Sequence, residues 1–160
     1  MKTILKLLII IIDKFEHSNY CKLRNVISLL LNRDYKLSFV KSENMYKKTY
    51  KNKKYVYYSD KKRAVRIHSP YNEMISNLIY SYCLENIDFK DNDVIIDCGA
   101  NIGELGLFFS EQNFLVNYIG LEPSSKEFSA CKLNNPHSEI LNLGLWNKKS
   151  KLNFYIKSET

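Results

Sequence analysis

The chain has 160 residues, which is about the size of one ordinary domain. Hydrophobic residues make up 45% and charged residues 26%, close to globular averages, so a disordered or collagen-like chain is excluded. The net charge of +7 is local: the segment from Tyr46 to His68 holds nine basic residues and one acid, Asp60, and the rest of the chain is essentially neutral.

The first 45 residues are predicted to form a helical cap that carries no chemistry. The uninterrupted apolar run Leu7–Ile12 has six residues, far short of the roughly 20 that span a bilayer. A helix that packs into a core is the favoured interpretation. The alternatives are an interfacial helix whose Lys2, Lys6 and Lys14 sit near lipid headgroups, or an export signal without a small-residue cleavage site. A second helical pattern follows over Cys21–Asn32.

Residues 46–70 are predicted to form a basic β-hairpin and linker. The runs Lys53–Tyr58 and Arg63–His68 are β-prone, and the polar segment 59–62 between them reads as a turn. A solvated hairpin is the favoured interpretation, with an anionic small molecule or glycan as a second possibility. Tyrosines among lysines can also stack bases, but nucleic acid is disfavoured because no known nucleic-acid-binding motif accompanies them.

Residues 71–160 carry the functional signal. A helical pattern runs from Tyr71 to about Asn86, and three apolar β-prone residues, Val94–Ile96, then predict a strand buried on both faces of a parallel sheet. The strand ends in Asp97, and a turn with Gly99 and Gly103 leads into the next helix. In an open α/β sheet, ligands bind at the carboxyl ends of the strands, which is where this turn lies.

The second strand, Val116–Leu121, ends in Glu122-Pro123, and Glu122 lies 19 positions after Gly103. An acid at about this distance from a glycine turn accepts hydrogen bonds from ribose hydroxyls. The pattern then predicts a helix over Ser124–Asn134, a third strand over Glu139–Leu143 and a further extended run over Lys151–Ile156.

Two cofactor classes share this plan. A dinucleotide-binding turn has the pattern G-x-G-x-x-G, but Asn101 replaces the middle glycine here. Asp97 would repel a pyrophosphate, whereas a carboxylate suits the sulfonium and amino groups of S-adenosylmethionine. The methyl donor is therefore favoured, and a nicotinamide-dependent oxidoreductase is the alternative.

Two motifs together, D-C-G-A-N-I-G-E and Y-I-G-L-E-P-S-S-K-E-F, resemble the FkbM family of S-adenosylmethionine-dependent methyltransferases. The family's hallmarks are D-x-G-A-N-x-G after the first strand and an acid-proline pair after the second. The resemblance covers about residues 66–156. It implies a class I, Rossmann-like methyltransferase fold, S-adenosylmethionine as cofactor, and O-methylation of a sugar or other small-molecule hydroxyl.

The resemblance also implies a cofactor site, transferred residue by residue. Glu122 would bind the ribose hydroxyls and Pro123 would shape the adjoining turn, with Asn142 and Gly144 at the adenine rim. For Glu104, complementing the helix dipole is an equal alternative to binding the ligand. The methionine side of the donor would be lined by the turn itself: Asp97, Gly99, Ala100, Asn101, Gly103 and Glu104.

Similar proteins continue with further strands and an acidic motif. The chain is therefore expected to be an α/β protein that contains the amino-terminal half of a methyltransferase sheet. In such a half-sheet the strand Val94–Ile96 would lie at an open edge. The chain is also expected to be incomplete as an enzyme. The alternative from another class is an inactive truncated or nucleic-acid-binding protein that uses the basic hairpin. No general base and no oligomeric state are predicted.

The cysteines and histidines predict neither a disulfide framework nor a metal site, because no C-x-x-C or H-x-x-x-H pair occurs. Scattered free thiols fit a reducing compartment, so a cytoplasmic protein is expected, with peripheral membrane contact through the first helix as an alternative. The residues in question are Cys21, Cys83, Cys98, Cys131, His17, His68 and His137.

Overall fold

A computed structural model describes residues 2–66, 70–148 and 150–151 as a mixed α/β protein with two small sheets. The chain divides into two compact units, Met1–Asn77 and Leu78–Thr160. The prediction of an α/β chain is thus confirmed, and the second unit contains the predicted parallel strands.

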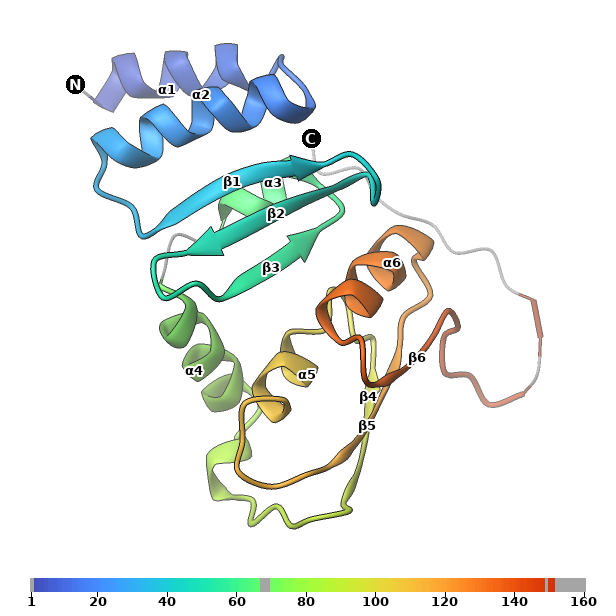
Figure 1. The fold of residues 1–160 in the computed structure, drawn as a ribbon. Helices are drawn as coiled ribbons and strands as arrows, with labels where there is room; N and C mark the ends of the chain where they lie inside the picture. The colour runs from blue at the N-terminus through green and yellow to red at the C-terminus, as the bar shows by residue number, and fades with distance from the viewer. Residues whose placement is uncertain (1, 67–69, 149, 152–160) are drawn as a thin grey trace. The chain divides into compact units, whose positions relative to one another are not determined.

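The first unit combines an antiparallel helix pair with an antiparallel sheet (Figure 1). Helix α1 spans Lys2–Ile12 and α2 spans His17–Leu30, and the strands are β1 (Tyr35–Val40), β2 (Met45–Tyr50) and β3 (Tyr55–Tyr58) in that order across the sheet. Tyr35 pairs with Tyr50 and Tyr46 with Tyr58. The region expected to be purely helical therefore ends in a strand.

Helix α2 is fixed on β1 by side chains that replace missing strand partners. The amide of Asn25 donates to the Leu37 carbonyl at 2.8 Å, and its oxygen accepts the Leu37 N–H at 2.7 Å. The Ser28 hydroxyl donates to the Tyr35 carbonyl. Because β1 lies at the sheet edge, these bonds satisfy backbone groups that would otherwise need water.

The predicted hairpin is wrong in its second arm. Strand β3 pairs with β2, and residues Lys61–Arg66 form a short helix, α3, rather than a strand. Asp60 explains the difference, because its carboxylate accepts the backbone N–H groups of Lys62 and Arg63 at 2.8 and 3.0 Å, as an N-cap does. Residues 67 and 68 of the predicted arm lie outside the described residues.

Helix α4 (Tyr71–Ser81) begins in the first unit and ends in the second. Its first turns belong to the core of the first unit: the Tyr71 ring packs edge-to-face on Tyr50, and Met74 sulfur accepts the hydroxyls of Tyr50 and Tyr58. The helix is shorter than predicted, and a 3-10 turn, η1 (Leu84–Asn86), follows it.

The second unit is built on a three-stranded parallel sheet (Figure 1). Strands β4 (Val94–Cys98), β5 (Asn117–Leu121) and β6 (Glu139–Leu141) are neighbours in that order, in the register Asp97–Gly120 and Gly120–Ile140. Helices α5 (Glu104–Phe109) and α6 (Ser125–Asn134) connect them. The core residues are Ala100, Phe109, Tyr118, Cys131 and Ile140.

The expectation that the first strand is buried on both faces is wrong. Val94 and Ile96 are 59% and 60% exposed, whereas Ile95 packs against the core. Within the described residues β4 has β5 as its only strand neighbour, so it lies at an edge, as the sequence predicts. The extended run over Lys151–Ile156 lies outside the described residues from position 152 onward.

No helix among the described residues is both long enough and apolar enough to cross a bilayer.

Candidate functional site

The turn after β4 is tied to the end of β5 by backbone hydrogen bonds. The N–H groups of Gly99 and Ala100 both donate to the Leu121 carbonyl, at 2.9 and 3.0 Å. Gly99, Asn101 and Gly103 all have positive φ, at 89°, 55° and 82°. Glycine tolerates this region freely and asparagine better than most residues, so the G-A-N-I-G sequence suits a turn with alternating left-handed residues.

Glu122 follows β5 directly and lies against this turn. One carboxylate oxygen accepts the Asn101 N–H at 2.8 Å, and the other accepts the Ser124 N–H at 2.7 Å. The residue is 6% exposed. The acid of the second motif is thereby held beside the glycine turn of the first motif.

Asp97, the last acidic residue before the turn, receives a hydrogen bond of 2.6 Å from the hydroxyl of Tyr118 on β5. Tyr118 is buried, and its burial together with the adjacent carboxylate raises the pKa of its phenol. The phenol therefore stays protonated and acts as a donor that orients the Asp97 side chain.

Two asparagines at the end of α6 support the turn from inside the protein. The Asn134 amide donates to the Ile102 carbonyl at 2.7 Å, and the Asn135 amide donates to the Gly103 carbonyl at 3.0 Å. A Cβ atom at Gly103 would overlap with the Asn135 amide and lie 2.8 Å from the Cys131 sulfur. Gly103 is thus required by internal packing, whereas a Cβ at Gly99 would meet open space.

The predicted adenine-rim residues lie beside the acid-proline pair. The Asn142 amide donates to the carbonyls of Glu122 and Pro123, at 2.8 and 3.2 Å, and its oxygen accepts the Ser125 hydroxyl. A Cβ at Gly144 would lie 3.6 Å from the Pro123 ring. Asn142 fixes the loop after β6 on the end of β5.

Most of the predicted residues thus meet at the carboxyl ends of β4 and β5, although their roles differ. Ala100 is buried in the core, and its backbone N–H is already bonded, so it supports the turn and lines no open space. Glu104 begins α5 and is half-buried. Asp97 is half-buried, and Gly99, Asn142 and Gly144 are the exposed positions of the set.

Sequence reasoning missed Tyr118, Asn134 and Asn135. Tyr118 sits within a strand pattern in which an aromatic residue reads as ordinary core. The two asparagines stand at the helix end before Pro136, where they read as a helix stop. Their partners lie 21 to 32 positions away, so no local pattern marks these contacts.

The chemistry of the site suits a ligand with both cationic and hydroxyl groups. A carboxylate oxygen can accept two hydrogen bonds, and each Glu122 oxygen accepts one from the backbone here. Asp97 adds a second carboxylate at the end of the neighbouring strand. No group of three His, Cys, Asp or Glu side chains suited to a metal ion occurs among the described residues.

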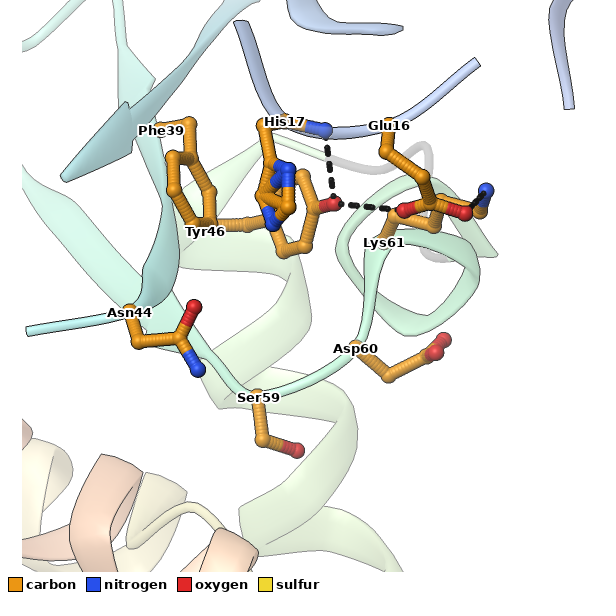
Figure 2. Close-up of a pocket in the computed structure, with 8 residues that line it drawn as sticks. All are labelled: Glu16, His17, Phe39, Asn44, Tyr46, Ser59, Asp60 and Lys61. Atoms are coloured by element: carbon orange, nitrogen blue, oxygen red, sulfur yellow. Dashed lines mark hydrogen bonds and ion pairs between the residues drawn. The ribbon is translucent and has the colours of Figure 1, made fainter. Parts of the chain in front are cut away.

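A separate, shallow pocket of about 220 Å³ lies in the first unit (Figure 2). None of the predicted cofactor-binding residues lines it. The Tyr46 hydroxyl joins two of its walls, since it accepts the His17 backbone N–H at 3.2 Å and donates to Glu16 at 3.3 Å. Glu16 also binds Lys61, so the pocket's charged groups serve internal contacts. The lining residues are Glu16, His17, Phe39, Asn44, Tyr46, Ser59, Asp60 and Lys61.

Comparisons with models of protein families, with curated proteins and with solved structures found no match to this chain.

Proposed function

We propose that the second unit binds S-adenosylmethionine at the carboxyl ends of β4 and β5. The proposal extends to activity: the chain is the donor-binding part of an O-methyltransferase similar to the FkbM family, with a sugar or other small-molecule hydroxyl as acceptor. The observation that carries it is the hydrogen bond between the Asn101 N–H and Glu122, because it joins the two motifs on which the resemblance rests.

The residues at this edge divide the recognition between them. Glu122 offers its remaining lone pairs to the ribose hydroxyls. Asp97, oriented by Tyr118, offers negative charge to the cationic methionine end, and open space over Gly99 leaves room for that end to approach. When bound, S-adenosylmethionine supplies an electrophilic methyl group, and the protein contributes mainly by positioning it.

The same residues disfavour a dinucleotide. A pyrophosphate needs a close backbone approach without an opposing carboxylate, and Asp97 stands at that place. Gly103, which such a ligand would need to remain uncovered, faces the Asn135 side chain instead.

Calorimetric titration of the full chain with S-adenosylmethionine and with S-adenosylhomocysteine tests the proposal. The two ligands differ by the methyl group and the sulfonium charge. A carboxylate about 5 Å from that charge at an effective dielectric near 20 is worth a few kcal/mol, so Asp97→Asn should weaken S-adenosylmethionine binding at least tenfold. It should weaken S-adenosylhomocysteine binding much less.

The matched control is Asp88→Asn, because the Asp88 side chain is 92% exposed and lies outside the site. This variant should bind both ligands like the unaltered chain. A folded chain that binds neither ligand would overturn the proposal. Titration with NAD provides the competing test, and tighter binding of NAD than of S-adenosylmethionine would favour an oxidoreductase.

A further inference from the structure

Helix α1 has more apolar surface than the first unit covers. Ile12 is buried, and Leu5 and Ile9 are partly buried at the matching helical spacing. On the remaining surface Leu7, Ile10 and Ile11 are more than half exposed. A surface helix normally turns polar residues to water, but the run from Leu7 to Ile12 contains none.

The second helix adds to this apolar surface. In α2, Val26, Leu29 and Leu30 follow the i, i+3, i+4 spacing of one helix face, and Leu29 and Leu30 are 81% and 78% exposed. The two helices run antiparallel, so this end of α2 lies beside the beginning of α1 (Figure 1). Exposed apolar side chains on two neighbouring helices are typical of an interaction site in a folded protein.

The charges around the two helices favour an anionic partner. The first 33 residues hold six basic and two acidic side chains. Both acids are engaged within the unit: Asp13 pairs with Arg24 at 2.8 Å, and Glu16 pairs with Lys61 (Figure 2). Lys6, Lys14 and Lys22 are exposed. The charge presented to a partner is therefore positive.

The surface is also preformed. Lys61 donates to the carbonyls of Asp13 and Phe15, both at 2.8 Å, and thereby holds the connection between α1 and α2 on the start of α3. The Arg24–Asp13 pair bridges the end of α1 to the middle of α2. Little ordering of this connection is then required when a partner binds.

We propose that the α1–α2 surface, formed by Leu7, Ile10, Ile11, Val26, Leu29 and Leu30 with the adjacent exposed lysines, docks on a lipid bilayer that carries anionic headgroups. Eleven residues at about 1.5 Å each give α1 a length of roughly 16 Å, about half of a bilayer core, so the helix lies in the interface and does not span it. A second copy fits less well because its lysines would face like charges.

Flotation of the full chain with phosphatidylcholine vesicles, with and without phosphatidylglycerol, tests this surface. The chain should bind the anionic vesicles at least tenfold more tightly, and added salt should weaken the binding. The double variants Leu7→Gln/Ile11→Gln and Leu29→Gln/Leu30→Gln should each lose most of this binding. Leu115→Gln, a change at an equally exposed leucine of the second unit, should leave it intact.

The contribution of charge is measured separately. Lys6→Glu/Lys14→Glu should lower binding to anionic vesicles about tenfold and leave binding to neutral ones unchanged. The control Lys53→Glu/Lys54→Glu has the same net charge but alters exposed lysines outside the α1–α2 surface. Equal losses in both variants would overturn the proposal, as would a chain that binds no vesicles. Sedimentation without lipid reveals a dimer, and a dimer that the leucine variants dissociate would assign the surface to a second copy.

Discussion

The phenol of Tyr118 on β5 donates a hydrogen bond of 2.6 Å to the carboxylate of Asp97 on β4. The phenol approaches from the core side of the sheet, and Tyr118 itself is almost fully buried. The donor is therefore shielded from water, while Asp97 is half-buried. This hydrogen bond connects the packing of the sheet to the orientation of Asp97, the carboxylate that is proposed to face the cationic end of the ligand.

Tyr118→Phe should affect stability and binding together. A hydrogen bond to a charged group contributes about 1.5–3 kcal/mol, so the free energy of unfolding in urea should fall by that order. Because Asp97 loses its fixed orientation, affinity for S-adenosylmethionine should fall several-fold. The exposed Tyr80 supplies the control, since Tyr80→Phe should alter neither quantity. Unchanged affinity in Tyr118→Phe would contradict the role of Tyr118 in orienting Asp97 for binding.

The glycines of the turn should respond differently to the same substitution. Gly103→Ala places a methyl group against Asn135 and Cys131 and strains a positive φ, so it should destabilise the chain by about 3 kcal/mol or more. Gly99→Ala meets open space and should cost only the backbone strain, about 1–2 kcal/mol. Urea unfolding of both variants measures the difference. Equal losses would contradict the packing role of Asn135.

The cap of α3 provides a third prediction. Asp60→Ala removes the acceptor for the N–H groups of Lys62 and Arg63 and should lower the free energy of unfolding by about 1 kcal/mol. Asp60→Asn keeps a side-chain oxygen and should lose much less. Circular dichroism during urea unfolding checks both variants, and an equal loss in the two would indicate that charge, not capping, is the cause.

The elements of the second unit could be predicted because each leaves a local pattern. Val94–Ile96 is a short apolar run, and the glycine turn and the acid-proline pair follow strands at fixed distances. Parallel strands align their carboxyl ends, so the meeting of Asp97 and Glu122 at one edge follows from order alone. The order of strands and helices does not predict the burial of Ala100 or the approach of Asn135 to Gly103, because both depend on packing between distant segments.

The first unit was harder to predict because its signals conflict. Arg63–Arg66 has a β-branched valine and reads as a strand, but the Asp60 cap and burial of Ala64 and Val65 favour a helix. Tyr35–Val40 alternates in burial around Leu37, and this period of two is typical of a strand. In the sequence this strand is hard to recognise because it follows two helical patterns. The partner of β3 is β2, which precedes it, and the two strands are joined by the turn at residues 51–54, not by the polar segment 59–62.

Lys48 gives the last prediction, a dependence of stability on pH. Its side chain is fully buried near the rings of Tyr35 and Tyr50, with ammonium-to-centroid distances of 4.3 and 5.0 Å. Burial, reinforced by the positive charge of Arg33, lowers the pKa of Lys48 from 10.5 to about 8. Between these two values the unfolded chain holds a proton that the folded chain has released, so this residue's contribution to stability rises with pH.

Lys48→Met should therefore stabilise the chain most below about pH 8, where the Lys48 amine is protonated in both the folded and the unfolded chain. The expected gain in the free energy of unfolding is about 1–3 kcal/mol at pH 7, and it should shrink as the pH rises from about 8 toward 10.5. Urea unfolding across this range, with the exposed Lys53→Met as control, measures the gain. A gain that stays constant over the range would mean that added apolar packing, and not removal of a buried charge, stabilises the variant.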